Sequence, residues 1–329
     1  MPIVENSSYK SPLFFCNSHL QTIYPSYARK LEKVNYTREN FLAPDKMHIY
    51  LDWSKVGSDK LVIVSHGLCG NTNRHYVLST VKTFNSDGWD VLAWNYRGTG
   101  PTPMEDTSSM TTNNSTDHLS WVIEHAILTG HYRKVVLLGF SMGGNLNVLY
   151  LSREAAAVPD ELLCSVSFCA TIDVNASSRC FDSFMGNVYF RYFKKRLKKI
   201  VLSVEELSPG SVKNLSRLDA VSNIQEYDNL YTAPLAGFRN AEDYWTRSSA
   251  WRWLGKLQVP SLVVNPKNDP FLAGKCYPIE EALNGNALFL EMPEGGGHCG
   301  FFNYGNGEWW PMTRAKEFVH SICDSANCQ

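Results

Sequence analysis

A serine between glycines has the clearest capacity for chemistry in this 329-residue sequence. Ser141 lies in Gly139-Phe140-Ser141-Met142-Gly143-Gly144, after an apolar run at 135–138 and before a helix-compatible segment at 145–153. A G-x-S-x-G sequence at such a place is typical of a sharp strand-to-helix turn that exposes the hydroxyl, and Gly139 and Gly143 avoid the clash that larger side chains would make. The pattern predicts that Ser141 is a nucleophile.

A serine hydroxyl is a weak nucleophile, so it needs a neighbouring base, and the base needs an acid that orients it. Asp269 follows a predicted strand at 261–265, and His298 follows three glycines after another predicted strand at 287–291. Serine, then acid, then histidine is one of the chain orders in which such triads occur. We therefore predict that Ser141, Asp269 and His298 form a catalytic triad.

Acyl transfer also needs hydrogen-bond donors for the negative oxygen that develops on the substrate. The N–H of Met142 opens the helix after Ser141, and the loop Ser65-His66-Gly67-Leu68 follows a predicted strand at 61–64. Gly67 permits the backbone geometry in which the N–H of Leu68 points at the substrate. We expect the N–H groups of Met142 and Leu68 to form the oxyanion hole, with His66 fixing the loop.

The elements that position these residues alternate between strand and helix, as in a doubly wound sheet. Apolar runs at 61–64, 89–94 and 135–138 suit strands buried on both faces, and a helical period of apolar residues lies at 117–128. Further strands are expected at 162–170, 261–265 and 287–291, and a closing helix at 311–323. The pattern predicts an α/β fold with a mostly parallel central sheet flanked by helices.

This alternation stops between 171 and 256, where no strand pattern is seen. Strand-like segments resume afterwards and would complete the same sheet, which disfavours a separately folding domain. We predict one domain over 1–329, with a mainly helical cap inserted at 171–256.

Within the cap, the run at 188–200 mixes six basic residues with tyrosine and phenylalanine. Such a segment could dock on anionic lipid as basic amphipathic helices do. The alternative is a cap helix with one solvated basic face and one aromatic face against the core or an acyl site.

Composition excludes several other classes of protein. The 31 Lys and Arg nearly balance the 32 Asp and Glu, whereas a nucleic-acid binder would show a basic excess. A hydrophobic fraction of 44% argues against global disorder, and no apolar run is long enough to cross a bilayer. The sequence says nothing about oligomeric state.

Location and cofactors are constrained by what the sequence lacks. The first residues contain no apolar run of signal-peptide length, so we expect a cytoplasmic protein, with peripheral membrane contact through 188–200 as the open alternative. Nine scattered cysteines without a C-x-x-C pair indicate reduced thiols rather than a zinc site. We expect no metal and no organic cofactor.

Together these motifs resemble the α/β-hydrolase superfamily, and more narrowly its YheT-like branch, which is related to plant embryogenesis-associated proteins and to yeast medium-chain fatty-acid ethyl ester synthase/esterases. The resemblance spans almost the whole chain, over segments 17–23, 66–68, 95–98, 139–143, 228–238, 268–271 and 296–298. It implies hydrolysis of carboxylic esters with short- to medium-chain acyl or lipid-like groups, through an acyl-enzyme on Ser141.

Two other functions stay open at the level of sequence. An acyltransferase would use an alcohol in place of water in the second step, and the choice depends on how the cap excludes water. A non-catalytic binding protein on the same fold is disfavoured by the intact Ser141, Asp269 and His298.

Overall fold

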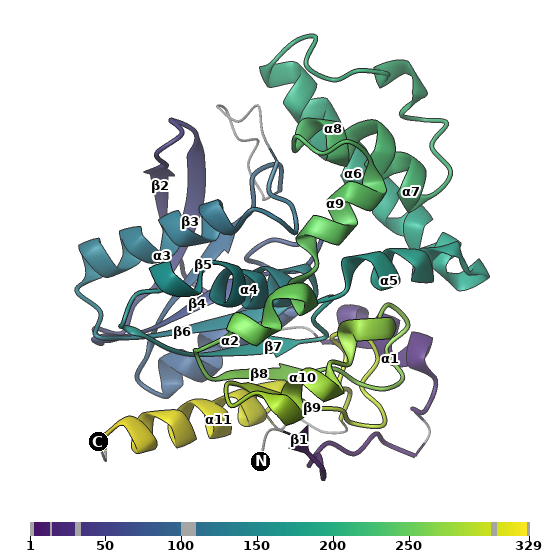
Figure 1. The fold of residues 1–329 in the computed structure, drawn as a ribbon. Helices are drawn as coiled ribbons and strands as arrows, with labels where there is room; N and C mark the ends of the chain where they lie inside the picture. Colours follow the sequence, from purple (N-terminus) through teal and green to yellow (C-terminus); the bar gives the residue numbers. More distant parts are fainter. Residues whose placement is uncertain (1–2, 14, 30–33, 100–109, 304–307, 328–329) are drawn as a thin grey trace.

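The computed structural model describes residues 3–13, 15–29, 34–99, 110–303 and 308–327 (Figure 1). One nine-stranded sheet, in the order β1-β9-β8-β7-β6-β4-β5-β3-β2, runs through the molecule. Its strands are β1 (Ile3–Val4), β2 (Thr37–Leu42), β3 (His48–Ser54), β4 (Lys60–Ser65), β5 (Asp90–Asn95), β6 (Lys134–Phe140), β7 (Leu162–Phe168), β8 (Ser261–Val264) and β9 (Leu288–Glu291). All neighbours pair in parallel except β2 with β3 and β3 with β5.

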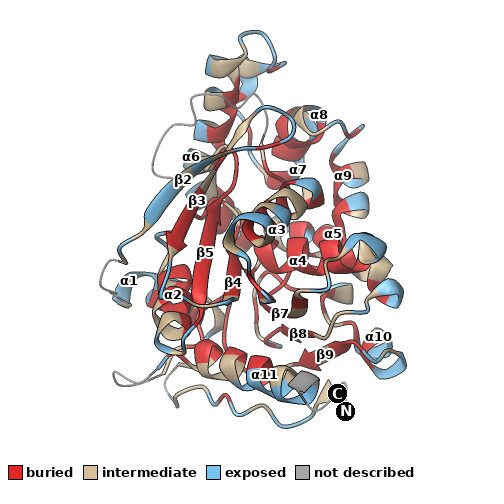
Figure 2. Ribbon diagram, turned by 90° about the vertical axis from the view of Figure 1, so that its left-hand side faces the viewer, coloured by how far each residue is buried: buried red, intermediate tan, exposed pale blue. Residues whose placement is uncertain are grey.

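The predicted strands correspond to β4 to β9, whose side chains are almost all buried (Figure 2). Continuous apolar runs reveal such strands because both faces are covered. Sequence reasoning missed β1, β2 and β3. Strand β2 has the sequence TRENFL and an exposed-and-intermediate burial pattern at the edge of the sheet, so its composition carries little hydrophobic signal.

Helices cover both faces of the sheet. One face packs against α2 (His75–Ser86) and α11 (Trp310–Asn327), and the other against α3 (Thr116–Gly130), α4 (Met142–Arg153) and α10 (Ile279–Asn284). The predicted helices at 117–128, 145–153 and 311–323 are therefore present, each somewhat longer. The expected α/β fold is confirmed. Among the described helices, none combines the length and apolarity needed to cross a membrane.

A helical insert lies between β7 and β8 and stands over the carboxyl edge of the sheet (Figure 1). Every residue from 171 to 256 lies in helix, turn or coil. The insert contains α5 (Val174–Arg179), α6 (Phe184–Leu207), α7 (Ile224–Tyr227), a π-helical turn (Asp228–Thr232), α8 (Ala233–Leu235), α9 (Ala241–Ser248) and a 3-10 segment (Ala250–Lys256). Its mainly helical character agrees with the prediction.

The basic run at 188–200 belongs to α6, which has 24 residues. One face of α6 is buried in the insert's own apolar cluster, through Phe190, Leu197, Ile200, Val201 and Val204. The opposite face is exposed. The helix therefore packs as a cap helix and also presents a free surface.

Candidate active site

Ser141 occupies the turn between β6 and α4 in a strained backbone conformation, with φ 54° and ψ −119°. A positive φ is uncommon for a residue with a side chain and marks a position that the fold enforces. The turn leaves no room for side chains at its glycines, because backbone atoms of the β4 loop and of the turn itself lie against them. A Cβ added at Gly143 would lie 2.2 Å from the carbonyl oxygen of Ser65, and one at Gly139 would lie 2.6 Å from that of Gly143.

The structure brings Ser141, His298 and Asp269 into one hydrogen-bonded chain. His298 follows β9 and places its Nε2 2.8 Å from the Oγ of Ser141. Its Nδ1 lies 2.8 Å and 3.0 Å from the two carboxylate oxygens of Asp269, in the loop after β8. The Asp269 side chain is fully buried, and its Oδ1 also accepts from the N–H of Phe271 at 2.9 Å. In the neutral imidazole, a proton on Nδ1 points to Asp269 and the lone pair of Nε2 points to Ser141.

The surroundings of His298 strengthen it as a base. Burial lowers the pKa of His298, but the charges of Asp269 and Cys299 and the hydrogen bond to Asp269 raise it further than burial lowers it, to about 9. A carboxylate beside an imidazole favours the protonated form. The imidazole is thus arranged to accept a proton from a hydroxyl beside it.

The loop after β4 lies against the serine turn. Gly67 approaches the serine so closely that an added Cβ would lie 3.2 Å from the Cβ of Ser141. The next residue in the chain, Leu68, is therefore close to the serine as well. Met142 is the first residue of α4, whose opening N–H groups have no partner within the helix. Leu68, Ser141, Met142 and His298 all line the same pocket. These positions are compatible with the prediction that the backbone N–H groups of Leu68 and Met142 donate to a substrate oxygen.

His66 is buried and remains neutral. Its Nδ1 donates to the carbonyl oxygen of Gly67 at 2.8 Å, and its Nε2 accepts from the N–H of Tyr96 at 3.4 Å. Burial lowers the pKa of His66 to about 3. Because both nitrogens hold backbone groups of loops, His66 acts as a structural part of the loop.

The pocket in front of Ser141 is enclosed mainly by the insert and combines an apolar wall with a polar patch. The apolar wall comes from the β4 loop, the insert and its neighbours, through Leu68, Met110, Phe181, Phe193, Leu197, Ile200 and Ile224. The polar patch consists of Thr111, Thr112, Asn113, Asp228, Thr232 and Tyr244. Such a pocket suits a substrate with an apolar part and a hydrogen-bonding part.

Sequence reasoning missed the residues that hold the His298 loop. They lie on α1 (Ser18–Ala28). The N–H of His298 donates to the Oγ1 of Thr22 at 2.9 Å, and the N–H of Gly296 donates to the Oε1 of the buried Gln21 at 2.5 Å. Asn268 links the two loops, because its Oδ1 accepts from the N–H of Gly297 at 3.0 Å. Gln21 and Thr22 both lie in the segment 17–23 that carries part of the family resemblance, and these bonds connect that segment to the His298 loop.

Asp228 is a second group whose position the sequence did not indicate. It lies in the π-helical turn, is buried, lines the pocket and accepts a 2.7 Å hydrogen bond from the Nε1 of Trp245. Burial raises the pKa of Asp228 to about 6, against the hydrogen bonds from Thr232 and Trp245 that lower it. A carboxylate with a raised pKa in an enclosed pocket is a feature of functional sites.

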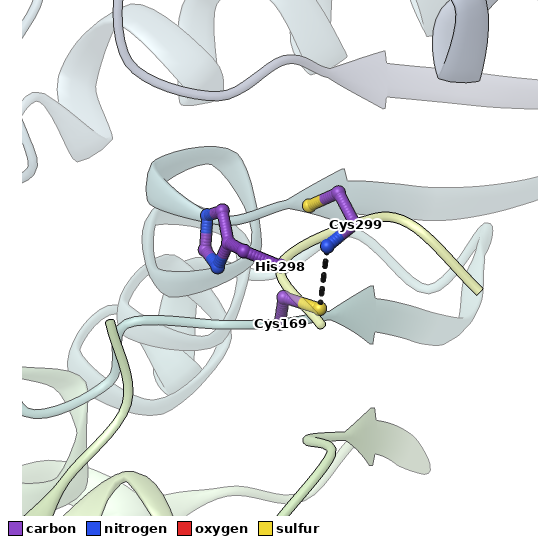
Figure 3. Close-up of side chains that lie close together, drawn as sticks. All are labelled: Cys169, His298 and Cys299. Carbon is purple, nitrogen blue, oxygen red and sulfur yellow. Dashed lines mark hydrogen bonds between the residues drawn. The ribbon is translucent and has the colours of Figure 1, made fainter. Parts of the chain in front are cut away.

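Two cysteines meet beside His298 (Figure 3). The ligand atoms of Cys169, His298 and Cys299 lie within 4.8 Å of one another, and the N–H of Cys299 donates to the Sγ of Cys169 at 3.1 Å. Among the described residues this is the group that could hold a metal ion. Both ring nitrogens of His298 already have partners, so a metal there would displace Ser141 or Asp269 from the histidine.

Comparisons with known proteins agree with this architecture. The family model described as "alpha/beta hydrolase fold" matches residues 60–303. The chain is 27% identical over 321 residues to the "Putative esterase YheT" of Escherichia coli, covering 95% of this chain and 93% of that protein. It is 25% identical over 289 residues to the human monoacylglycerol lipase ABHD2, covering 82% of this chain and 67% of the relative.

Among solved structures, the Pyrococcus furiosus esterase PF2001 superposes with a TM-score of 0.58 at 17% identity, covering 87% of this chain and 91% of that one. At that identity the likeness supports the fold alone. The relatives are esterases and lipases by name, and the resemblance inferred from the motifs is confirmed. The chain belongs to the α/β-hydrolase fold family.

Proposed function

We propose that this protein is a serine hydrolase that cleaves carboxylic esters through an acyl-enzyme on Ser141. The observation that carries the proposal is the chain of hydrogen bonds from Ser141 to His298 to Asp269, with the serine open to a pocket. The names of the relatives, an esterase and a monoacylglycerol lipase, support the same class of reaction.

In the first step, the Oγ of Ser141 attacks the ester carbonyl carbon while the Nε2 of His298 takes the hydroxyl proton. The 2.8 Å separation of these atoms permits direct transfer. Asp269 stabilises the imidazolium that forms. The N–H groups of Leu68 and Met142 are placed to hold the negative carbonyl oxygen, and each such donor contributes on the order of 10²-fold or more in kcat.

The imidazolium then returns its proton to the leaving alcohol, and the acyl group stays on Ser141. In the second step, His298 takes a proton from water as the water oxygen attacks the acyl carbonyl carbon. The bond from that carbon to the Oγ of Ser141 then breaks, His298 returns the proton to Ser141, and the acid leaves. If an alcohol entered in place of water, the same residues would form a new ester. Acyl transfer is therefore the alternative outcome of the same acyl-enzyme.

The pocket supports a substrate with an acyl chain. Phe193, Leu197 and Ile200 of α6 and Ile224 of α7 form an apolar wall in front of Ser141. Burying apolar surface contributes about 0.8 kcal/mol per methylene group, so a longer acyl chain binds more tightly until the wall is filled. We propose short- to medium-chain or lipid-like acyl esters as the substrate class.

The first test is covalent labelling with a fluorophosphonate probe. Attack by the Oγ of Ser141 on phosphorus would release fluoride and leave a stable adduct, which mass spectrometry of peptides locates. We expect one adduct on Ser141 in the folded protein and none in the Ser141→Ala variant. A folded wild-type protein that forms no adduct would contradict the enzyme proposal and favour a binding protein on this fold.

The second test measures turnover of p-nitrophenyl esters of increasing chain length, with a monoacylglycerol included. Ser141→Ala should lower kcat by about 10⁶-fold, as loss of the nucleophile does in other serine hydrolases. Ser167→Ala is the matched control. Ser167 is buried in β7, and among the described residues its hydroxyl donates only to the carbonyl oxygen of Gly144. Adding an alcohol and measuring the ratio of new ester to free acid separates a transferase from a hydrolase.

A further inference from the structure

Exposed apolar side chains gather in two segments of this protein. Of the fourteen large hydrophobic residues that are exposed among the described residues, nine lie in 13–27 and 184–202. They are Leu13, Leu20, Ile23, Tyr24, Tyr27, Phe184, Val188, Tyr192 and Leu202. Single exposed hydrophobic residues are ordinary, but a gathered set marks an interaction surface.

The two segments lie side by side although they are far apart in the sequence. The Nδ1 of His19, on α1, lies 3.0 Å from the hydroxyl of Tyr189, on α6. Their ring centroids are 5.8 Å apart. Helix α1 and the first half of α6 therefore meet at this contact.

The exposed side of α6 has two rows at helical spacing. Phe184, Val188 and Tyr192 repeat every four residues, and Arg191, Lys195 and Lys199 form a row of the same spacing that is displaced by seven residues. Residues four apart stack along one side of a helix, so an apolar row runs beside a basic row. No carboxylate among the described residues pairs with these three cations, whereas the neighbouring Lys198 pairs with Asp219.

We propose that this surface, called here the α1/α6 face, docks on an anionic lipid bilayer. It consists of the exposed apolar residues at 13–27 and 184–192 together with Arg191, Lys195 and Lys199. Apolar side chains inserted at the depth of the headgroups, beside cations that meet lipid phosphates and carboxylates, are the pattern of interfacial helices. The choice of an anionic bilayer rests on charge complementarity with the basic row.

The α1/α6 face adjoins the reaction centre. Tyr189, which contacts His19, also packs against Phe271 with ring centroids 4.7 Å apart, and Phe271 packs against His298 at 4.8 Å. On the inner side of α6, Phe193, Leu197 and Ile200 line the pocket. Docking would bring the pocket to the surface where lipid-like esters reside. That consequence rests on the proposed function, whereas docking itself does not.

The test is co-sedimentation of the full chain with vesicles, one kind of phosphatidylcholine alone and the other of phosphatidylcholine with phosphatidylserine. We expect sedimentation with the anionic vesicles and little with the neutral ones. The triple variant Arg191→Gln/Lys195→Gln/Lys199→Gln should reduce the partition coefficient by about a hundred-fold, since each cation near such a surface contributes about five-fold. Neutralising three exposed cations elsewhere, Lys46, Lys213 and Lys256, should change it much less.

The apolar row has its own matched pair of variants. Phe184→Ser/Val188→Ser should weaken binding roughly ten-fold or more, because both side chains would leave the lipid. Leu128→Ser/Leu283→Ser removes two exposed hydrophobic residues from α3 and α10 and should have no effect on sedimentation. None of these residues lines the pocket, so hydrolysis of a water-soluble ester should be unchanged in all of the variants.

Three results would overturn the proposal. The first is equal, negligible sedimentation with both kinds of vesicle. The second is an equal loss of sedimentation with anionic vesicles in the α1/α6 variants and in their control variants. The third is a dimer in solution that Phe184→Ser/Val188→Ser dissociates, since the face would then be covered by a second copy. Because Ser141→Ala should bind vesicles as the wild type does, failure of docking and failure of the proposed chemistry can be told apart.

Discussion

The backbone N–H of His298 donates a hydrogen bond to the hydroxyl of Thr22, 2.9 Å away. The two residues are 276 positions apart in the sequence. Beside this contact, Gly300 approaches α1 so closely that an added Cβ would lie 1.9 Å from the carbonyl oxygen of Gln21. Helix α1 thus sets the position of the loop that holds the histidine, although α1 contributes no side chain to the proposed chemistry.

Replacing Gln21 tests this support. In Gln21→Leu, the N–H of Gly296 and the side chain of Asn268 lose their acceptor. Buried groups left without partners cost about 1 to 3 kcal/mol each, so we expect the free energy of unfolding to fall by about 2 to 6 kcal/mol. A shifted histidine should lower kcat by about 10²-fold with a smaller change in KM.

The control for Gln21→Leu is Ser26→Ala, which removes an exposed hydroxyl from the same helix. It should change neither stability nor kcat measurably. If Gln21→Leu lost stability but kept full kcat at a temperature where it is folded, Gln21 would be structural only, and the positioning role would be wrong.

Asp269→Asn tests the charge that raises the pKa of His298. A base must be neutral to accept a proton, so kcat/KM should rise with pH through the pKa of His298, about 9 in the wild type. Without the carboxylate charge this pKa falls, and the rising limb should move to lower pH. The plateau should also drop by about 10⁴-fold, because an amide favours the wrong tautomer of the imidazole.

The measurement is a pH profile of kcat/KM on one soluble ester. Cys299→Ser is an informative companion, because the charge of Cys299 also raises the pKa of His298 while the residue makes no contact with Ser141 among the described hydrogen bonds. We expect a smaller shift of the limb in the same direction, with the plateau preserved. If the rising limb of the pH profile lay at the same pH in the wild type and both variants, the charges of Asp269 and Cys299 would not set the pKa of His298.

Gly143→Ala tests the tightness of the serine turn. The new methyl group would lie 2.2 Å from the carbonyl oxygen of Ser65 and 2.6 Å from that of His66, and both are backbone atoms that cannot rotate away. The loop that presents Leu68 must therefore move, and we expect esterase activity to fall by at least 10²-fold. Gly255→Ala is the control, since no atom lies within 4 Å of its added Cβ. Thermal unfolding of both variants separates lost activity from lost structure.

The fold and the meeting of three side chains could be read from local patterns. Strands such as β4 and β6 are continuous apolar runs, and Ser141, Asp269 and His298 each follow such a strand at its carboxyl end. Parallel strands place those ends at one edge, so local signals determine which residues come together. Their hydrogen bonding is seen in the structure, and their catalytic roles remain predictions.

The features that escaped prediction depend on contacts with no local signal. The bond from Gly296 to Gln21 joins residues 275 apart, and Cys169 meets Cys299 only because β7 and the His298 loop are neighbours in space. The edge strand β2 carries too few apolar residues to be distinguished from a loop. These features depend on contacts between residues far apart in the sequence, and the periodicity of a single sequence contains no signal for such contacts.

The buried carboxylate of Asp228 gives the last prediction. Burial raises the pKa of Asp228 to about 6, above its usual value of 3.8. Between these values the folded protein binds more protons at this group than the unfolded chain, so its contribution to stability is lost as pH rises through the window. Asp228→Asn keeps an oxygen that accepts from the Nε1 of Trp245 but carries no charge. Relative to wild type, the variant should gain up to about 3 kcal/mol above pH 6 and little near pH 4.

Denaturant unfolding at a series of pH values measures this difference, and Asp243→Asn on α9 is the matched control. The backbone N–H of Arg239 and its side chain lower the pKa of Asp243, so the same change of charge should there reduce stability at neutral pH. Opposite signs in the two variants would identify the burial of Asp228 as the cause, because the pKa of Asp243 is set mainly by its bonds to Arg239. A loss of stability in Asp228→Asn at neutral pH would mean that the ionised carboxylate is stabilised by its partners, and that Asp228 is held in the pocket as an anion.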